Sequence, residues 1–543
     1  MALAGDLSAS MVADVVPGVV ASDPRDIVAV GGTLFFTATD PSHGRELWKS
    51  DGTVAGTSLV KDINPGRGDS DTYQLTAVGN TLYFSATDGR NGQELWKSDG
   101  TAAGTVMVRN INEAAGFGSN PQSLTAVNGT LFFSAANSVR YPQKNTNGGW
   151  PVSINYELWK SDGTASGTVL VKDIAKGDQN SNPESLVNYN GKLYFRAWQS
   201  RTGSELWMSN GTSSGTVLVK DVLPGAESSW PDQLTVAGSR LAFTTISSAD
   251  MHGELWTTNG TPAGTSLIKS FPPATAPSQL TALNGRLAFL TKSETGVGLW
   301  SWNSAGMGAS LVRSFANASV VGTVADRVFL SADDGLTGNE LWVSDGTAAG
   351  TRLVKDIAPG LDAGALPRGS SPSAGRSLNG RIYFAADDGV YGQELWQSDG
   401  TAAGTSLVRD VQAGSAGSAP AYFSTANNNL YFAATDLDHG RELWQLPAET
   451  TASPTILATA SSHCHGTKSS KAAPKAVQQS KELPRDLQYS LRKDLLVSVN
   501  RKTASRSTVG TMAEQPSTET NTSAAEDWLD ALVFHQLDQS HGR

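Results

Sequence analysis

Residues 46–53 read ELWKSDGT, and the same eight letters return at residues 94–101 and 157–164. Weaker copies begin at Glu205, Glu254, Gly298, Glu340, Glu394 and Glu442. The tryptophans of these nine copies are separated by 48, 63, 48, 49, 44, 42, 54 and 48 residues. Self-similarity with a period near 48 residues indicates one supersecondary unit repeated nine times.

Each unit has the pattern of four short strands. In the second unit these are predicted at residues 74–78, 81–87, 93–98 and 105–111, with Gly, Asn and Asp between them. Short apolar or alternating runs joined by such turn residues are typical of antiparallel hairpins. One four-stranded sheet cannot bury both faces alone, so its neighbours must stack around an axis. The sequence therefore predicts an all-β fold, a β-propeller of about nine blades.

The phase of the repeat predicts how the ring closes. Residues 11–16 copy the fourth-strand pattern ahead of the first full unit, and the last unit stops after Trp444. An N-terminal strand that completes the last blade would close the ring. Residues 455–458 are a rival for this place, but only the N-terminal segment is followed by the Pro-Gly pair found after other fourth strands.

The composition divides the chain into three parts. We predict a remnant leader or disordered segment at residues 1–10, the propeller at 11–446 and a flexible tail at 447–543. The tail contains a basic stretch rich in Ser, Ala and Gln, which is typical of a disordered linker. Apolar spacing and a capping box predict two short helices in it, at residues 481–500 and 523–539.

Charge and cysteine content exclude several classes. The net charge is −10, which disfavours nucleic acid as the main partner. The single Cys464 rules out a disulfide framework and a zinc site made of cysteines. No apolar run reaches the ~18 residues of a membrane-spanning helix. We expect a monomer without a cofactor.

The repeated string closely resembles the bacterial ELWxxDGT repeat proteins, predicted β-propellers of secreted or surface proteins. The resemblance covers roughly residues 11–446. It implies the fold and an extracellular or cell-surface location, and it implies no reaction. The opening MALAGDLSAS resembles the end of an export leader, although no complete signal peptide is present.

The repeated residues are interpreted as scaffold, because an active site is usually unique. Asp or Asn begins the DGT turns, where either side chain caps backbone N–H groups. The Trp of each copy is expected to pack between blades, and the Glu to bond to a neighbouring blade's turn. The structural tryptophans are Trp48, Trp96, Trp159, Trp207, Trp256, Trp300, Trp342, Trp396 and Trp444, and the turn aspartates are Asp51, Asp99, Asp162, Asp345 and Asp399.

Candidate binding residues lie where the repeat is broken. The largest insertion falls between the second and third strands of the third unit, and further non-repeat aromatics follow in the fourth. The 2–3 loops and the connections between blades emerge on the same face of a propeller. Aromatic and Arg side chains gathered there are typical of a binding surface. The candidates are Arg140, Tyr141, Trp150, Tyr156, Arg196, Trp198 and Trp230.

Aspartates that begin the 2–3 loops raise the weaker alternative of a Ca²⁺ site. They are Asp40, Asp88, Asp334, Asp388 and Asp436. Calcium needs several oxygens that converge on one point, and these residues lie in different blades without a DxDxDG string. We therefore expect no metal.

These observations favour a non-catalytic extracellular or cell-surface propeller that binds a glycan or a partner protein through one loop face. No GxSxG, HExxH, P-loop or Rossmann string is present, and the propeller contains few histidines. One alternative is a polysaccharide-active lyase or hydrolase with its site in the propeller funnel. The other is a structural matrix component.

Overall fold

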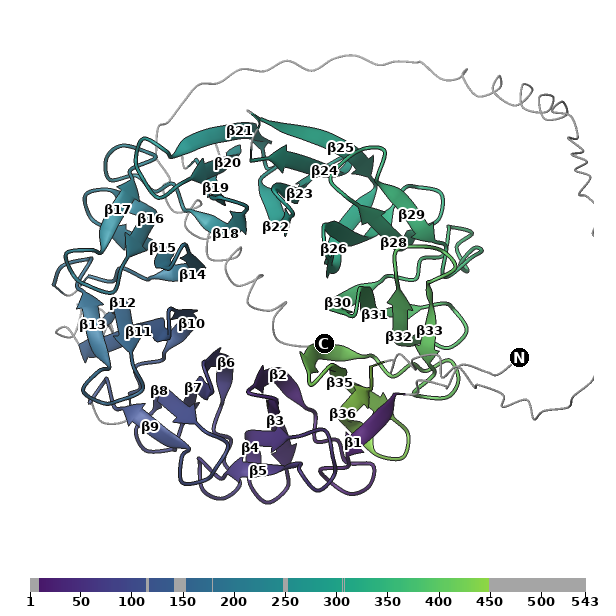
Figure 1. The fold of residues 1–543 in the computed structure, drawn as a ribbon, viewed down its shortest axis with the longest axis horizontal. Coiled ribbons are helices and arrows are strands. Elements are labelled where there is room, and N and C mark those ends of the chain that lie inside the picture. The colour runs from purple at the N-terminus through teal and green to yellow at the C-terminus, as the bar shows by residue number, and fades with distance from the viewer. Residues whose placement is uncertain are drawn as a thin grey trace, which may run out of the picture. The chain divides into compact units, whose positions relative to one another are not determined.

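The computed structural model of the chain describes residues 9–113, 117–140, 153–177, 179–247, 252–304, 306 and 308–448. These residues form nine antiparallel sheets of four strands, arranged as blades in a ring (Figure 1). The predicted all-β, nine-bladed propeller is confirmed. The described residues contain no helix long and apolar enough to cross a membrane. The predicted tail helices lie outside the described residues.

Strands run outward from the centre within each blade (Figure 1). The first three blades are β2 Arg25–Val30, β3 Thr33–Asp40, β4 Gly44–Ser50, β5 Ser58–Lys61; β6 Tyr73–Val78, β7 Thr81–Thr87, β8 Gln93–Ser98, β9 Val106–Arg109; and β10 Gln122–Val127, β11 Thr130–Arg140, β12 Ser153–Ser161, β13 Val169–Lys172. The next three are β14 Glu184–Tyr189, β15 Lys192–Gln199, β16 Gly203–Ser209, β17 Val217–Lys220; β18 Asp232–Ala237, β19 Arg240–Ile246, β20 His252–Thr258, β21 Ser266–Pro273; and β22 Pro277–Leu283, β23 Arg286–Ser293, β24 Gly296–Asn303, β25 Ala309–Phe315. The last three are β26 Asn317–Val324, β27 Arg327–Asp333, β28 Asn339–Ser344, β29 Arg352–Lys355; β30 Ser373–Leu378, β31 Arg381–Asp387, β32 Gln393–Ser398, β33 Ser406–Arg409; and β34 Ala421–Ala426, β35 Asn429–Asp436, β36 Gly440–Leu446, completed by β1 Ser10–Ala13.

The N-terminal strand closes the ring. β1 pairs antiparallel with β36, with Met11 opposite Trp444, and forms the outer strand of the ninth blade (Figure 1). This confirms the predicted closure by the N-terminal segment.

Hydrophobic cores lie between neighbouring blades. In β7, Leu82, Phe84 and Ala86 are fully buried. They pack in one cluster with Leu47 of the first blade and with Trp96 of their own. Each sheet thus depends on its neighbour for a second covered face, as expected of a repeat that cannot bury its apolar surface alone.

The glutamate of each ELW string has a different role from the predicted one. In the second blade, Glu94 accepts hydrogen bonds from the backbone N–H groups of Ile111, Asn112 and Ser119, at 3.0, 3.4 and 2.9 Å, and from the Ser119 hydroxyl at 2.6 Å. These donors belong to the connection that leaves Glu94's own blade, so the predicted bond to a neighbour's turn was wrong. The backbone turns inward toward the carboxylate, and β9 therefore ends at Arg109 rather than at Ile111.

We call this arrangement the glutamate latch, and seven blades have it. The latch residues are Glu46, Glu94, Glu157, Glu205, Glu340, Glu394 and Glu442, all of them fully buried. Burial raises the pKa of Glu46, Glu157, Glu205 and Glu442 to about 7. Each carboxylate satisfies donors that its connection would otherwise leave unpaired in the interior.

The DGT turns are capped by their first residue. Asp51 Oδ1 accepts hydrogen bonds from the backbone N–H of Thr53 at 2.9 Å and from its hydroxyl at 2.7 Å. Asn210 caps the equivalent turn of the fourth blade in the same way, at 3.0 and 2.8 Å. A neutral amide oxygen is therefore sufficient for this role.

Candidate functional site

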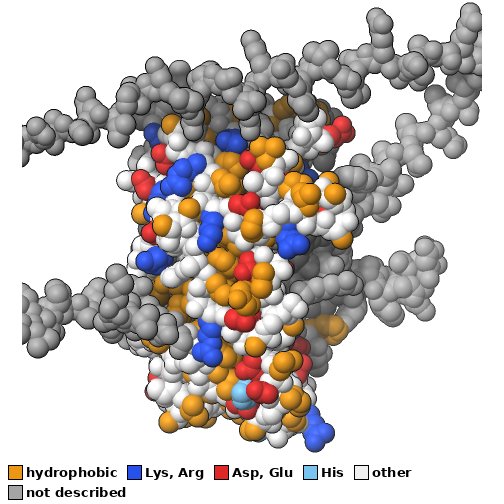
Figure 2. All heavy atoms as spheres, turned by 90° about the vertical axis from the view of Figure 1, so that its right-hand side faces the viewer, with side chains coloured by type: hydrophobic (Ala, Val, Ile, Leu, Met, Phe, Trp, Pro, Cys, Tyr) orange, Lys and Arg blue, Asp and Glu red, His pale blue; other side chains and the backbone are white. Residues whose placement is uncertain are grey.

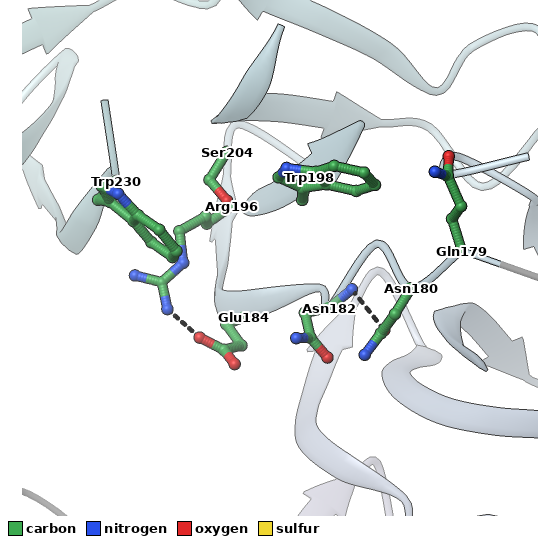
Figure 3. Close-up of a pocket in the computed structure, with 8 residues that line it drawn as sticks. All are labelled: Gln179, Asn180, Asn182, Glu184, Arg196, Trp198, Ser204 and Trp230. Carbon is green, nitrogen blue, oxygen red and sulfur yellow. Dashed lines mark hydrogen bonds and ion pairs between the residues drawn. The ribbon is translucent and has the colours of Figure 1, made fainter. Parts of the chain in front are cut away.

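A cavity of about 440 Å³ opens at the fourth blade (Figure 3). It is lined by residues of β14, β15 and β16 and by the connections that enter and leave this blade. The lining residues are Gln179, Asn180, Asn182, Glu184, Arg196, Trp198, Ser204 and Trp230. We call this cavity the blade-four pocket. It brings together three of the predicted binding residues, Arg196, Trp198 and Trp230.

Arg196 lies at the centre of the pocket wall. Its guanidinium forms an ion pair with Glu184, the residue directly opposite on β14. It also lies over the indole of Trp230, with its carbon 5.6 Å from the ring centroid, a cation–π contact (Figure 3). The Arg196 side chain is 18% exposed and that of Glu184 45%, so both signs of charge reach the cavity.

Trp230 has an unusual backbone. It lies in the connection between β17 and β18 with φ of 50°, in the left-handed region, and it remains 39% exposed. An L-residue in this region costs ~1–2 kcal/mol, and bulky residues rarely adopt it. Asn120 and Asn182 occupy the corresponding place in the two preceding connections with φ of 43° and 42°. The fold thus tolerates strain to present an indole where an asparagine would fit better.

Amide side chains line the opposite wall of the pocket, below Trp198 (Figure 3). Asn180 Oδ1 accepts hydrogen bonds from the backbone N–H groups of Asn182 at 3.0 Å and Tyr156 at 3.1 Å. This carbonyl therefore fixes the connection between the third and fourth blades. Gln179 and Asn182 contribute further amide groups to the lining.

The fourth blade differs from the others at the pocket positions. Arg196 lies opposite the Leu of its ELW string, where the other eight blades have Thr37, Ser85, Ser134, Thr244, Leu290, Ser331, Ala385 and Ala433. Trp198 replaces Thr39, Thr87 and Thr435 of the first, second and ninth blades. Nothing in the repeat requires these large side chains, so the scaffold does not explain them.

The remaining predicted binding residues are placed only in part. Tyr156 on β12 is half-buried and its hydroxyl bonds to the Asn120 side chain, while burial raises the pKa of the phenol. The backbone of Arg140 ends β11 opposite Ser153. Tyr141 and Trp150 lie outside the described residues.

Sequence reasoning missed the polar half of the pocket. Glu184 opens the inner strand of the fourth unit and is joined to Arg196 by a hairpin whose turn contains Asn190 and Gly191. Opposite charges at paired positions of a predicted hairpin would have indicated an ion pair. The amides of Gln179, Asn180 and Asn182 gave no such signal, because polar residues are frequent in every connection.

The loop aspartates considered for calcium are used within their own loops. Asp88 Oδ1, for example, accepts hydrogen bonds from the backbone N–H groups of Arg90 and Asn91, both at 2.9 Å. Asp40, Asp334, Asp388 and Asp436 cap their loops in the same manner. Within the described part of the chain, no group of three or more His, Cys, Asp or Glu is placed to hold a metal ion.

The rim of the ring is chemically mixed where Figure 2 shows it. On the side of the seventh and eighth blades, small hydrophobic patches alternate with basic and acidic side chains. This view therefore offers no single chemical character comparable with that of the blade-four pocket.

Neither a family model nor a curated protein matches the sequence. Among solved structures, a puromycin hydrolase is 14% identical with a TM-score of 0.36, over 67% of this chain and 59% of that one. A puromycin-hydrolyzing peptidase of Mycobacterium tuberculosis is 8% identical with a TM-score of 0.38, over 77% and 60%. The propeller domain of the Trilobed protease of Pyrococcus furiosus is 11% identical with a TM-score of 0.31, over 60% and 94%.

The matches correct one prediction. The chain spans about three-fifths of the length of the puromycin hydrolase and of the puromycin-hydrolyzing peptidase. The third match is a domain of a protease. These matches contradict the prediction of a non-catalytic surface propeller that binds a glycan or a partner protein. At these identities and TM-scores the likeness assigns no activity to this chain.

Proposed function

We propose that the chain binds a small zwitterionic ligand, of the class of a short peptide with free ends, in the blade-four pocket. The observation that carries the proposal is the pairing of Arg196 and Glu184 in a pocket that also holds the exposed indole of Trp230 and the half-buried indole of Trp198. A guanidinium binds a carboxylate through two parallel hydrogen bonds, and a carboxylate binds an ammonium group. One pocket therefore offers a partner to each end of such a ligand.

The other lining groups suit the middle of a peptide. Asn and Gln amides donate and accept hydrogen bonds as peptide groups do. Trp198 and Trp230 supply rigid apolar faces for an aromatic or aliphatic side chain. The cavity volume of about 440 Å³ lies in the usual range of small-ligand sites, ~300–1,000 Å³.

The strain at Trp230 supports the same proposal. Backbone conformations that cost free energy are retained mostly where function requires them. Replacing Trp230 by Asn, the residue of the two preceding connections, is expected to leave stability unchanged or raise it, since Asn tolerates φ of 50°. A purely structural tryptophan would instead lower stability when it is removed.

Isothermal titration of the full chain with the tripeptide Ala-Phe-Ala tests the proposal. We expect saturable binding, a loss of at least tenfold in affinity when both ends of the peptide are blocked, and a similar loss in Trp230→Asn and Arg196→Ser. Asp71→Asn is the matched control, because Asp71 has φ of 45° at the equivalent place beside the second blade. Absence of saturable binding at millimolar peptide, or full affinity in both pocket variants, would overturn the proposal.

A further inference from the structure

Three arginines converge on one aspartate where the ring closes. Asp23 lies in the connection between β1 of the ninth blade and β2 of the first. Its carboxylate is 2.5 Å from Arg25 Nη2, 2.9 Å from Arg45 Nη2 and 3.7 Å from Arg441 Nε. Residues far apart in the sequence thus form one charged cluster, which we call the arginine junction: Asp23, Arg25, Arg45 and Arg441.

The two half-buried arginines of the junction are specific to the closing blades. Arg45 and Arg441 each precede the latch glutamate of their strand. The same position in the other seven blades holds Gln93, Tyr156, Ser204, Gly253, Val297, Asn339 and Gln393, none of which is basic. Because closure makes the first and ninth blades neighbours, it places the two guanidiniums beside the same carboxylate.

The junction has more positive than negative charge in direct contact. Of the acidic residues nearby, Asp69 accepts the backbone N–H of Arg45 at 2.8 Å, and Asp26 is an exposed neighbour of Arg25. Burial lowers the pKa of Arg45 and of Arg441, and the charge of Arg25 acts in the same direction. Asp23 is thus the carboxylate in direct contact with all three guanidiniums, while Asp26 and Asp69 act on Arg25 and Arg45 from nearby.

Arg25 is the part of the junction that a ligand can reach, because 42% of its side chain is exposed. Its Nε is buried and has no hydrogen-bond partner among the described atoms. Tyr422, 38% exposed, is close enough to Arg25 and Arg441 to interact with both electrostatically. Its φ of 57° makes it, with Trp230, an aromatic residue held in the left-handed region.

We infer that the arginine junction binds a tetrahedral dianion, a phosphate or sulfate group that is either free or esterified. Guanidinium forks match the geometry of such oxyanions and are weakly hydrated. A dianion would add negative charge beside Arg25, whose side chain is the most exposed of the three. Tyr422 lies near Arg25 and Arg441, at the edge of the site. The inference is independent of the blade-four pocket, which uses other residues on another blade.

Titration of the full chain with inorganic phosphate, sulfate and phenyl phosphate in chloride-free buffer tests this inference. We expect saturable binding of at least one anion, with a preference for phenyl phosphate marking an ester as the ligand. Arg25→Ser should lower the affinity at least tenfold, since Ser278 and Ser373 occupy this place in other blades. Asp23→Asn should raise it several-fold, because it removes the competing carboxylate while keeping a residue that tolerates φ of 49°.

Arg90→Ser is the matched control, because Arg90 is an exposed arginine in the β7–β8 loop. It should bind the anions as the unmodified chain does. Equal affinity in Arg25→Ser, or no saturable binding by either the unmodified chain or Asp23→Asn, would overturn the inference. The second result would leave the junction as an electrostatic contact between the first and last blades.

Discussion

The second and fifth blades have the same four strands in the same order, but they end differently. In the second blade the latch residue Glu94 binds the departing connection, and β9 has four residues. In the fifth, Glu254 binds Trp256 Nε1 at 2.7 Å and the side chains of Thr245 and His252 instead, and β21 runs for eight residues.

The difference shows what the latch does. Where the carboxylate binds backbone donors, the chain leaves the sheet early and buries Ile111. Where it does not, the fourth strand continues alongside β20, and the aromatic Phe271 fills the space, 5.2 Å from the Trp300 ring. The sixth blade ends in the same way as the fifth, since Gly298 replaces the glutamate and the aromatic Phe315 is buried. Latch and aromatic residue are alternative ways to end a blade.

Removing the latch should have the largest effect on stability. Glu94→Ala leaves three backbone N–H groups and one hydroxyl without their acceptor in the interior, and each unsatisfied buried donor costs ~1–3 kcal/mol. We expect the free energy of unfolding to fall by ~3 kcal/mol or more, measured by guanidinium chloride denaturation. Glu254→Ala leaves only side-chain donors without an acceptor. It should therefore lower the free energy of unfolding clearly less than Glu94→Ala does. Equal losses would show that the latch has no special role.

Introducing the consensus glutamate into the sixth blade should also destabilise the fold. A Cβ at Gly298 would lie 2.8 Å from Trp300 Nε1 and 3.0 Å from Leu311 Cδ1, and the connection supplies no latch donors there. We expect Gly298→Glu to lower the free energy of unfolding by ~1–3 kcal/mol, the usual cost of overpacking. The consensus glutamate would then destabilise a blade whose connection has no donors for it. A gain in stability on denaturation would contradict this account.

The latches predict a pH dependence of stability. Burial raises the pKa of Glu46, Glu157, Glu205 and Glu442 to about 7 in the fold, above the unfolded value of ~4.3. A raised pKa stabilises the fold at low pH, and this contribution is lost as the pH rises through about 7. Calorimetry should therefore show a Tm that falls by several degrees between pH 5 and pH 8.

Two comparisons isolate the latch contribution to this slope. Burial acts to raise the pKa of Glu254, but hydrogen bonds from Trp256, His252 and Thr245 bring it below its ordinary value. Glu254→Gln should therefore leave the slope of Tm against pH unchanged. His43 and His439 also make stability fall as the pH rises, because hydrogen bonds to Asp40 and Asp436 raise the pKa of the two imidazoles. The slope should persist in the double variant His43→Asn/His439→Asn. Its disappearance there would assign it to the histidines.

The smallest effect is expected in the DGT turns. Asp51→Asn should leave the free energy of unfolding nearly unchanged, since Asn210 makes the same two hydrogen bonds in the fourth blade. Asp51→Ala removes the cap and should lower the free energy of unfolding by a small, measurable amount. If Asp51→Asn were as costly as Asp51→Ala in the same denaturation experiment, the charge of the aspartate would matter and the capping role would be incomplete.

The ring was predictable from the sequence because its period is long and nearly regular. The position of Trp48 and its eight counterparts gives the number of blades, and residues 11–16 indicate how they close. The end of β9 was not predictable, since it depends on a contact from Glu94 to Ile111, 17 positions away. The pocket was half predictable: Arg196, Trp198 and Trp230 break the repeat visibly, whereas Glu184 and the amides resemble ordinary connection residues.

The pairing of β1 with β36 imposes an order on biosynthesis. β1 is among the first parts of the propeller to leave the ribosome, and its partner strand is the last. Until β36 is made, β1 has no sheet to join, and the hydrophobic flanks of the first and ninth blades lack their mutual cover. The nascent ring is thus an open arc throughout translation, and its cohesion becomes complete in a single late event. A pulling force applied at β1 would reverse that event first.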